Sequence, residues 1–594
     1  MVVVRWNMYE TMQKVTLTSL VMVLACIVGC ARFYASRADK TAYNSIAGGQ
    51  NAALGDARGF DVKYSPFEQV PKLSAIRVGK KTISIGKVPQ ALLDTESKSE
   101  KLKLDDGLTR LTLNDCLTIA YRSSRDLQDR KEGLFSDALA VANGRRSWDF
   151  PLVDLALEGT GDHAKVHAGS ETAAGAGEGE LSITQRFVNG GVFTLAMALD
   201  TATDFVSWNS YAIGSMLDAN FTQPLLRGAQ AGLAYETQYR LERDFVLAVF
   251  DYERFTQTFG AGVVAQYYNV LRDRDTLENE WANISRLRQT YALTKVQVEV
   301  GQASRIAQDE AEQNLLNAQT RLQRSVETYR NSLDALKISL GLPVRADITV
   351  DYPKALNDLM SDAKASGLKP LGFDESRAID IAMSVRPDLL TQRAGARDAE
   401  RDVEIAADDF FPQLDLTVGF NAADGGGNRS TRLRWGDHTR TVGATFQYSL
   451  DQTDNRDAYR NAMLAAEQAK RELDEFEDNV RLSVRRSYRS LVQSGISYRL
   501  QLRSVQTALS RRKLAALEQK EGLASTDDVL RAEESLRNAQ NGLTQAMVSY
   551  TTTRLNFMAD LGMIEVDDKG VLNERKQPFE FERIRKRYTY LGGR

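Results

Sequence analysis

Residues 119–127 read IAYRSSRDL, and residues 381–389 read IAMSVRPDL. Further along the chain, FPLVDL at 150–155 is matched by FPQLDL at 411–416. The offsets are 262 and 261 positions, so the two copies run almost in register. Self-similarity at a fixed spacing is the signature of an internal repeat. The sequence therefore predicts a fold built from two copies of one unit, which we place at residues 111–341 and 373–563.

A third matching pair shows that the copies differ in length. GQAS at 301–304 corresponds to GLAS at 522–525, an offset of only 221 positions. The first copy has about 40 residues more than the second between its FP motif and its G-x-A-S motif. The surplus lies where the sequence is patterned like strands. It predicts either an extra hairpin or a long outer loop in the first copy.

Each G-x-A-S motif is flanked by helical periodicity. After each motif, apolar residues recur at steps of three and four, which is typical of amphipathic helices with coiled-coil-like packing. The segments before the motifs, residues 235–300 and 456–521, contain no proline and could form helices of about 100 Å. The matching stripes are Ala311, Leu315, Ala318, Leu322, Val326, Tyr329, Leu333, Leu336 and Leu340, and Ala532, Leu536, Ala539, Leu543, Met547, Tyr550, Phe557 and Leu561.

Strand patterns lie within residues 150–228 and 412–450. Polar and apolar residues alternate at 154–157, 181–187 and 415–420, and imperfectly at 441–450. Alternation with period two fits strands that have one lipid face and one lumen face. The Gly-rich segments 169–179 and 424–428 are expected to be connections between strands.

The first 29 residues are expected to be a signal peptide. Basic Arg5 and Lys14 precede a mostly apolar stretch, residues 15–29, that is too short to span a membrane. It ends in IVGC, which resembles a lipobox, so we expect lipidation at Cys30. An ordinary signal peptide with a chance cysteine is the alternative. No apolar run in the chain is long enough for a spanning helix, so a membrane crossing would require a closed β-barrel.

Composition excludes several classes of function. The formal net charge is −3, which argues against nucleic-acid binding. In the mature chain only Cys30 and Cys116 would remain, so no intramolecular disulfide is expected if Cys30 is acylated. The histidines His163, His167 and His438 lie in or beside expected outer loops and do not form a metal motif. We expect neither an enzyme nor a bound cofactor.

The repeated motifs carry a resemblance to the TolC-like outer-membrane efflux protein family, of the lipoprotein type. The motifs are RPDL at 386–389 with RDL at 125–127, the strand-opening Pro151 and Pro412, QPLLRG at 223–228, and the tip glycines Gly301 and Gly522. The resemblance implies an α+β membrane protein. Three chains would share one transmembrane β-barrel, continued by a long α-helical periplasmic tunnel. Residues 30–110 would be a periplasmic extension, 342–372 an equatorial linker, and 564–594 a C-terminal tail.

The same resemblance implies a passive export duct of a tripartite efflux or type I secretion system. Such a homotrimer docks onto a periplasmic adaptor and an inner-membrane pump. The residues expected to dock the adaptor lie at the two tips: Gly301, Ala303, Ser304, Gly522, Ala524 and Ser525. Asp528, with Asp527 beside it, would form an acidic ring at the tunnel entrance. A helix-start aspartate favoured by the helix dipole is the alternative for Asp528.

Two other classes of protein are the alternatives to an export duct. A lipid-anchored periplasmic coiled-coil scaffold or adaptor would need the long helices but not the alternating segments repeated in both copies. A general porin would need the strands but not helices of about 100 Å. The sequence does not indicate which substrate is exported.

Overall fold

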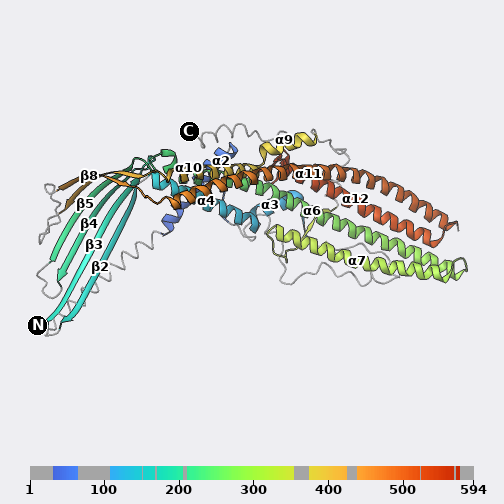
Figure 1. The fold of residues 1–594 in the computed structure, drawn as a ribbon. Coiled ribbons are helices and arrows are strands. Elements are labelled where there is room, and N and C mark those ends of the chain that lie inside the picture. The colour runs from blue at the N-terminus through green and yellow to red at the C-terminus, as the bar shows by residue number, and fades with distance from the viewer. Residues whose placement is uncertain are drawn as a thin grey trace, which may run out of the picture.

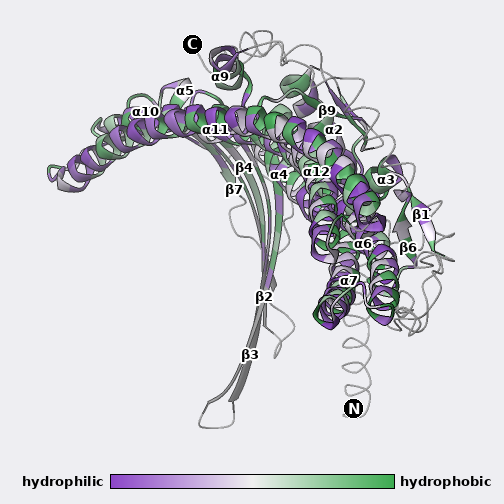
Figure 2. Cartoon of the chain, turned by 90° about the vertical axis from the view of Figure 1, so that its right-hand side faces the viewer, coloured by the Kyte–Doolittle hydropathy of each residue, from purple (hydrophilic) through white to green (hydrophobic). Residues whose placement is uncertain are grey.

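The computed structural model describes residues 31–55, 57–63, 108–149, 151–166, 170–204, 211–352, 374–423, 438–521, 523–567 and 570–574. Figure 1 shows an elongated molecule with a β-sheet at one end and long helices that reach the other end. In Figure 2 the sheet is a curved layer that leaves the end of the helical part.

The two repeats have the same order of elements, which confirms the predicted fold of long helices combined with strands. Each repeat opens with two helices, continues with strands and closes with a helical hairpin. The opening helices are α3 (Leu113–Ser123) and α4 (Arg125–Asp149), then α9 (Glu375–Val385) and α10 (Pro387–Asp408). The hairpins are α6 (Glu236–Glu299) with α7 (Arg305–Ser339), and α11 (Thr453–Lys520) with α12 (Thr526–Asp560). A short helix, α5 (Ala231–Ala234), precedes α6.

The predicted long helices are present with nearly the predicted bounds. Helices α6 and α11 have 64 and 68 residues, so each extends for about 100 Å. All nine stripe residues of the first hairpin are buried. In the second, Leu543 and Tyr550 are only half-buried. Among the described helices, none has an apolar stretch long enough to cross a membrane.

Each repeat is closed by a glycine that lets its last helix end against its first. Gly341 has φ +72° and follows α7, and its backbone lies directly against Ser123 at the end of α3. The Ser123 hydroxyl donates to the Leu340 carbonyl at 2.8 Å. Gly562, with φ +64°, follows α12 and contacts Val385 at the end of α9 in the same way.

The strands form a single antiparallel sheet of six in the order β2-β3-β4-β5-β7-β8. The first repeat supplies β2 (Leu152–Val166), β3 (Ser170–Arg186), β4 (Val192–Asp204) and β5 (Tyr211–Pro224). The second supplies β7 (Gln413–Ala423) and β8 (His438–Gln447). The surplus residues of the first repeat therefore form an additional hairpin, one of the two possibilities that the sequence left open.

The predicted connection at residues 169–179 is wrong, because residues from Ser170 onward belong to β3. Gly175, Gly177 and Gly179 pair with Gly161, Gly159 and Leu157 of β2. Ladder hydrogen bonds come from the backbone, so a strand can contain several glycines when its neighbours on both sides fix its path. The other predicted connection, residues 424–428, lies outside the described residues.

The N-terminal extension contains a helix that the sequence analysis missed. Helix α2 (Ala31–Leu54) buries Ala42 and Ile46 in a cluster with Leu134 of α4 and Phe250 of α6. Gly49 lies beneath the ring of Phe245, where a Cβ atom would approach the ring to 2.6 Å. Ile46 is the one large apolar side chain among its described buried residues, which are otherwise Ala42, Gly49, Gln50 and Ala53, so its apolar stripe is weak in the sequence.

Short strands from distant parts of the chain surround the middle of the helices. β1 (Thr109–Leu111) pairs in parallel with β6 (Ile348–Val350), and β9 (Ile564–Val566) pairs with β10 (Leu572–Glu574). Leu111 and Ile348 belong to the same buried cluster as Tyr267 of α6, and Leu572 packs against it. Segments at the start of the first repeat, between the repeats and after the second repeat thus pack at the same level of α6.

We predict that Gly341→Ala destabilises the protein strongly. Alanine at positive φ costs about 1–2 kcal/mol, and the new Cβ would lie 1.9 Å from the Ser123 carbonyl oxygen, so the closure must shift. Thermal unfolding followed by the helical circular-dichroism signal measures the effect. Gly395→Ala is the matched control, because this helical glycine has open space around it and should tolerate alanine. Equal midpoints for Gly341→Ala and the wild type would contradict the closure.

Candidate functional site

The tips of the two hairpins lie together at the end of the molecule opposite the sheet (Figure 1). Near the tips the Thr294 hydroxyl of α6 is 3.3 Å from the Thr526 hydroxyl of α12, and both side chains are buried. The Thr526 hydroxyl also accepts from the Gln519 side chain of α11 at 3.5 Å. The two predicted tip motifs, far apart in the sequence, therefore contribute to one surface.

The first tip is a tight turn that depends on Gly301. This residue has φ +74°, and the Gln302 amide donates to the Gln297 carbonyl at 2.7 Å. Ser304 then caps α7 by accepting from the Ala307 amide at 3.2 Å. A Cβ atom at Gly301 would meet nothing within 4 Å, so glycine is needed for its backbone conformation and the surface around it is open. Ala303 is half-buried, and Ser304 is exposed.

The described residues of the second tip make the same turn and cap hydrogen bonds as those of the first tip. The Leu523 amide donates to the Glu518 carbonyl at 2.8 Å, and Ser525 caps α12. Ala524 is half-buried like Ala303. Gly522 lies outside the described residues.

Asp528 takes part in a capping box at the start of α12. Its carboxylate accepts from the Ser525 amide at 3.1 Å and from the Ser525 hydroxyl at 2.7 Å, while Ser525 accepts from the Asp528 amide. These hydrogen bonds lower the pKa of Asp528 below its ordinary value. Asp527 points to Arg531 and forms an ion pair of 2.9 Å with it. The structure therefore gives Asp528 a local role at the helix start, and its carboxylate remains exposed.

Both tips carry large apolar side chains exposed to solvent, which the sequence analysis did not single out. Leu523 is 81% exposed at the second tip, and Ile306 is 70% exposed at the first. Val296 and Val300 at the end of α6, and Leu514 and Leu517 at the end of α11, are also exposed. Clustered apolar side chains on an outer surface are typical of a site for another protein. In the sequence they appear as leucine, isoleucine and valine among mainly polar residues near the two G-x-A-S motifs.

A buried carboxylate ties the two hairpins together behind the tips. Glu533 of α12 is 4% exposed and accepts from Arg286 of α6 and, at 2.9 Å, from Arg512 of α11. Removing one partner of such a pair leaves a buried charge uncompensated, at a cost of about 3–5 kcal/mol. The tips are therefore held in a fixed relation to each other.

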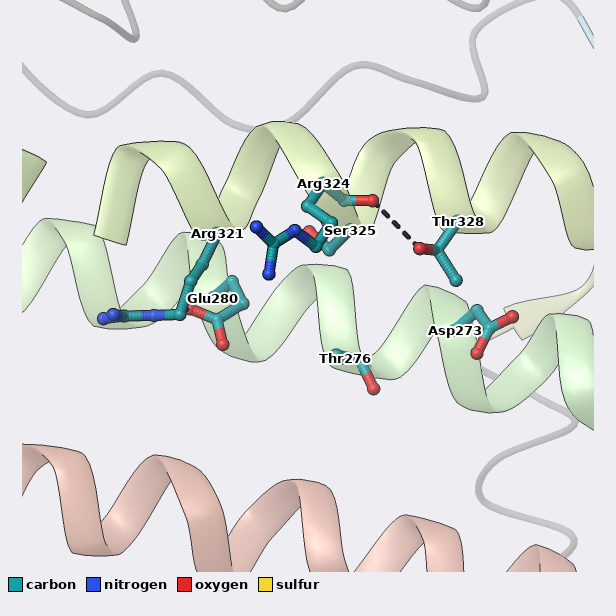
Figure 3. Close-up of a pocket in the computed structure, with 7 residues that line it drawn as sticks. All are labelled: Asp273, Thr276, Glu280, Arg321, Arg324, Ser325 and Thr328. Atoms are coloured by element: carbon teal, nitrogen blue, oxygen red, sulfur yellow. Dashed lines mark hydrogen bonds and ion pairs between the residues drawn. The ribbon is translucent and has the colours of Figure 1, made fainter. Parts of the chain in front are cut away.

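A cavity of about 260 Å³ lies between α6 and α7, further from the tips (Figure 3). Its walls include two carboxylates and two guanidinium groups. Glu280 lies 3.6 Å from both Arg321 and Arg537, and burial together with the nearby Arg537 lowers the pKa of Arg321. The lining residues are Asp273, Thr276, Glu280, Arg321, Arg324, Ser325 and Thr328. Glu280 is paired with arginines of α7 and α12, which indicates a joint between helices.

The two faces of the sheet differ sharply in polarity. One face carries the row Leu155, Leu181, Met197, Leu217 and Ala422, one residue from each of five neighbouring strands. The predicted alternation of the strands is thus present in the structure, and it continues into residues that the sequence analysis did not mark.

The opposite face is acidic. Glu158, Glu178 and Asp200 lie directly beside one another on β2, β3 and β4, and Arg186 is the only basic residue on this face among the described strand residues. Like charges placed directly opposite destabilise a dry sheet, so this face is suited to water. This face also carries Asp154, Glu180, Asp218 and Asp415.

His163 and His438, the two histidines within the described residues, lie on different strands. His438 begins β8, and its ring stacks on Phe420 with centroids 5.5 Å apart. His163 lies within β2 rather than in a loop, and His167 is outside the described residues. Among the described residues, no group of three potential ligands lies close enough to hold a metal ion.

Comparison with known proteins identifies a matching family model and several relatives. Residues 378–563 match the family model described as outer membrane efflux protein. The alkaline protease secretion protein AprF of Pseudomonas aeruginosa is 26% identical over 338 residues, which cover 55% of this chain and 66% of that protein. The outer membrane protein TolC of Escherichia coli is 24% identical over 405 residues, which cover 63% of this chain and 76% of that protein.

A solved structure agrees with these matches. The CmeC outer membrane channel of Campylobacter jejuni has a TM-score of 0.55 at 16% identity, covering 81% of this chain and 90% of that chain. At this level of identity the match concerns the fold. The chain has the long helices and strands of these outer-membrane channels.

We predict that Asp528→Ala loosens the first turn of α12, because two hydrogen bonds to Ser525 disappear. Amide hydrogen exchange at the start of α12 should become faster. Asp527→Ala is the control, because it removes only the exposed pair with Arg531. The lowered pKa of Asp528 means that its contribution is complete above about pH 4 and is lost as the pH falls through that lower pKa. Equal exchange in both variants would contradict the capping role.

Proposed function

We infer that this chain, which belongs to the TolC-like outer membrane efflux protein family, is the outer-membrane channel of an efflux or type I secretion system. The supporting observation is a sheet with one apolar and one acidic face, joined to four long helices that end in two adjacent tips. Channels of this family are not enzymes. Purified protein in a planar bilayer should conduct ions, and a protein that never conducts would overturn the inference.

We propose that three copies assemble into one closed barrel. In a single chain, β2 and β8 are the two edges of the sheet. Their outward side chains are strongly exposed: Leu155 is 68%, Leu157 is 78% and Val442 is 75% exposed. Long apolar edge strands are a hazard unless another strand covers them. Because β2 and β8 run in opposite directions, β8 of one copy can pair with β2 of the next in the same antiparallel pattern.

The helical part supports the same assembly. The long helices lie abreast in the order α7-α6-α12-α11, so α7 and α11 are the outer two. Helix α11 leaves Ile496, Leu500 and Leu517 exposed by 52%, 63% and 61%. Both outer helices expose charges of either sign, such as Arg489 and Asp478 on α11, so the apolar side chains support this contact. Helix α11 of one copy would therefore pack against α7 of the next.

The tips are the proposed docking surface for a periplasmic adaptor and, through it, an inner-membrane pump. The small residues Ala303 and Ala524 permit close approach of a partner helix, and the exposed Leu523 and Ile306 supply apolar area. Gly301 and Gly522 would provide the turns, and Ser304 and Ser525 the helix starts beside them. The sheet lies at the other end of the molecule, so docking would not disturb it (Figure 1).

We predict that Leu523→Lys weakens retention of the adaptor and impairs export, while the trimer still forms. Leu523 is 81% exposed and makes the tip apolar, so the change removes a contact without touching the core. Affinity purification of the complex from the native host measures adaptor retention. Gln302→Lys is the control, since it adds the same charge at the equivalent position of the first tip. Loss of the trimer in Leu523→Lys would instead give this residue a role in folding.

We further propose that Asp528, with Asp527, forms an acidic ring at the entrance of the tunnel. Both lie in the first turn of α12, directly after the second tip. Asp528 is exposed, and its lowered pKa keeps it charged at neutral pH. Three copies around one axis would concentrate cations at the entrance.

Multivalent cations added from the periplasmic side are expected to block the channel, and Asp528→Ala should weaken the block. Conductance in a planar bilayer measures it. Adjacent helical residues point about 100° apart, so Asp527→Ala should have a smaller effect. If only Asp527→Ala removes the block, the ring is formed by Asp527. If neither change matters, the entrance carries no acidic ring.

The N-terminus is proposed to be a lipid anchor at Cys30. Cys30 lies outside the described residues, and the described chain starts directly after it with α2, which packs on α4 and α6. We predict that mass spectrometry of the mature protein finds acylated Cys30 as its first residue. Cys30→Ser should lose the lipid and keep the fold. A mature chain that starts elsewhere with an unmodified residue would exclude the anchor.

A further inference from the structure

All six strands of one chain are present at the same level of the sheet. A continuous row of paired residues crosses it from edge to edge: Leu152, Thr184, Thr194, Asn220, Gly419 and Thr441. The additional hairpin of the first repeat is therefore not an appendage above a smaller sheet. It widens the sheet where the strands leave the helices (Figure 1).

The additional strands carry the same two faces as the others. In a second row, Val153, Ile183, Leu195, Ala219 and Phe420 follow one another on the apolar face. Leu181 and Met197 extend the neighbouring row between β2 and β5. These two rows are apolar from β2 to β7, and β8 ends them with Arg440 and His438. The face that β3 and β4 carry is suited to lipid. Both strands therefore belong to the membrane wall.

The width of this sheet matches the width of the helical layer beneath it. Four helices abreast at about 9 Å cover roughly 36 Å of arc. Six strands about 4.8 Å apart and tilted by about 40° cover roughly 38 Å. With two strands from each repeat, as the second repeat has, the sheet would cover only about 25 Å. The additional hairpin thus lets the wall of strands continue the wall of helices without a narrowing.

From these observations we propose that the assembled channel has a wall of eighteen strands and a lumen wide enough for a helical hairpin. The inference rests on the proposed trimer, since three copies of six strands give eighteen. The backbone radius would be about 18 Å, and side chains fill about 5 Å of it. The free width is then about 26 Å, enough for two helices side by side at about 10–12 Å each. A twelve-stranded wall would leave about 14 Å, which admits only one helix.

The acidic face fits such a lumen. The row of Glu158, Glu178 and Asp200 lies on β2, β3 and β4, so two of its three carboxylates are on the additional strands. In a wide water-filled pore these charges stay solvated and apart, whereas a narrow pore would bring three such rows close together. A wide water-filled channel therefore suits the carboxylates that the additional hairpin brings.

Polymer exclusion in a planar bilayer tests the width. Polyethylene glycols of graded hydrodynamic radius are added to the full-length trimer on the side of the outer loops, and the conductance shows which ones enter. We expect polymers of up to about 12 Å radius to enter the wild-type channel. Exclusion already at about 7 Å would overturn the eighteen-stranded wall while leaving the channel intact. A wild-type protein that does not conduct would instead overturn the proposed function.

A deletion of residues 167–210 provides the matched comparison. It removes β3 and β4 and joins the outer ends of β2 and β5. Leu155 and Leu217 lie in the same row, so the new neighbours keep their apolar faces aligned. The exclusion limit should fall from about 12 Å to about 7 Å radius. A deleted channel with an unchanged limit would overturn the proposal, and the wild-type measurement decides it if the deleted chain does not fold.

Discussion

Helices of 64 and 68 residues exist here because each has a partner packed along its length. Tyr267, Leu277 and Ile284 of α6 share a buried cluster with Leu315, Leu322 and Tyr329 of α7. Burying one such side chain contributes roughly 1.5–3 kcal/mol, whereas an exposed ion pair contributes about 0–1 kcal/mol. The apolar seam, rather than the many surface charges, therefore holds each hairpin together along its length and places the tips far from the sheet.

Charged groups have a different task in this molecule, which is to fix one repeat against the other. Arg243 of α6 is bonded to Glu236 at 2.7 Å and to Asp398 of α10 at 2.8 Å, and Arg401 bonds the same Glu236 at 2.9 Å. These side chains are largely buried. Together with the Glu533 joint behind the tips, they hold the repeats together at both ends of α6. Hydrophobic contact is non-directional, so an apolar seam alone would allow the helices to slide along each other. Hydrogen bonds between charged groups require a defined geometry and therefore fix the register of the helices.

The sequence was sufficient for the repeats and the long helices, because these depend on self-similarity and on local periodicity. It was insufficient where neighbours in space decide the outcome. The glycines of β3 look like a loop until β2 and β4 pair with them, and α2 has too weak a stripe to be recognised without its partners. At the tips, Gly301 was predicted from its backbone requirement. The exposure of Leu523 was not predicted, because a sequence does not show whether a leucine side chain is covered by other residues.

The pairing between β5 and β7 has a consequence for how the chain is made. Asn220 and Gly419 are neighbours in the sheet but 199 positions apart in the sequence. The first four strands are therefore synthesised long before the strand that must join them. Contacts at such separation form slowly, because a long loop must close first. During that interval the apolar face from Val153 to Phe221 is uncovered in an aqueous compartment. The additional hairpin of the first repeat thus enlarges the apolar surface that stays uncovered until β7 and β8 are made.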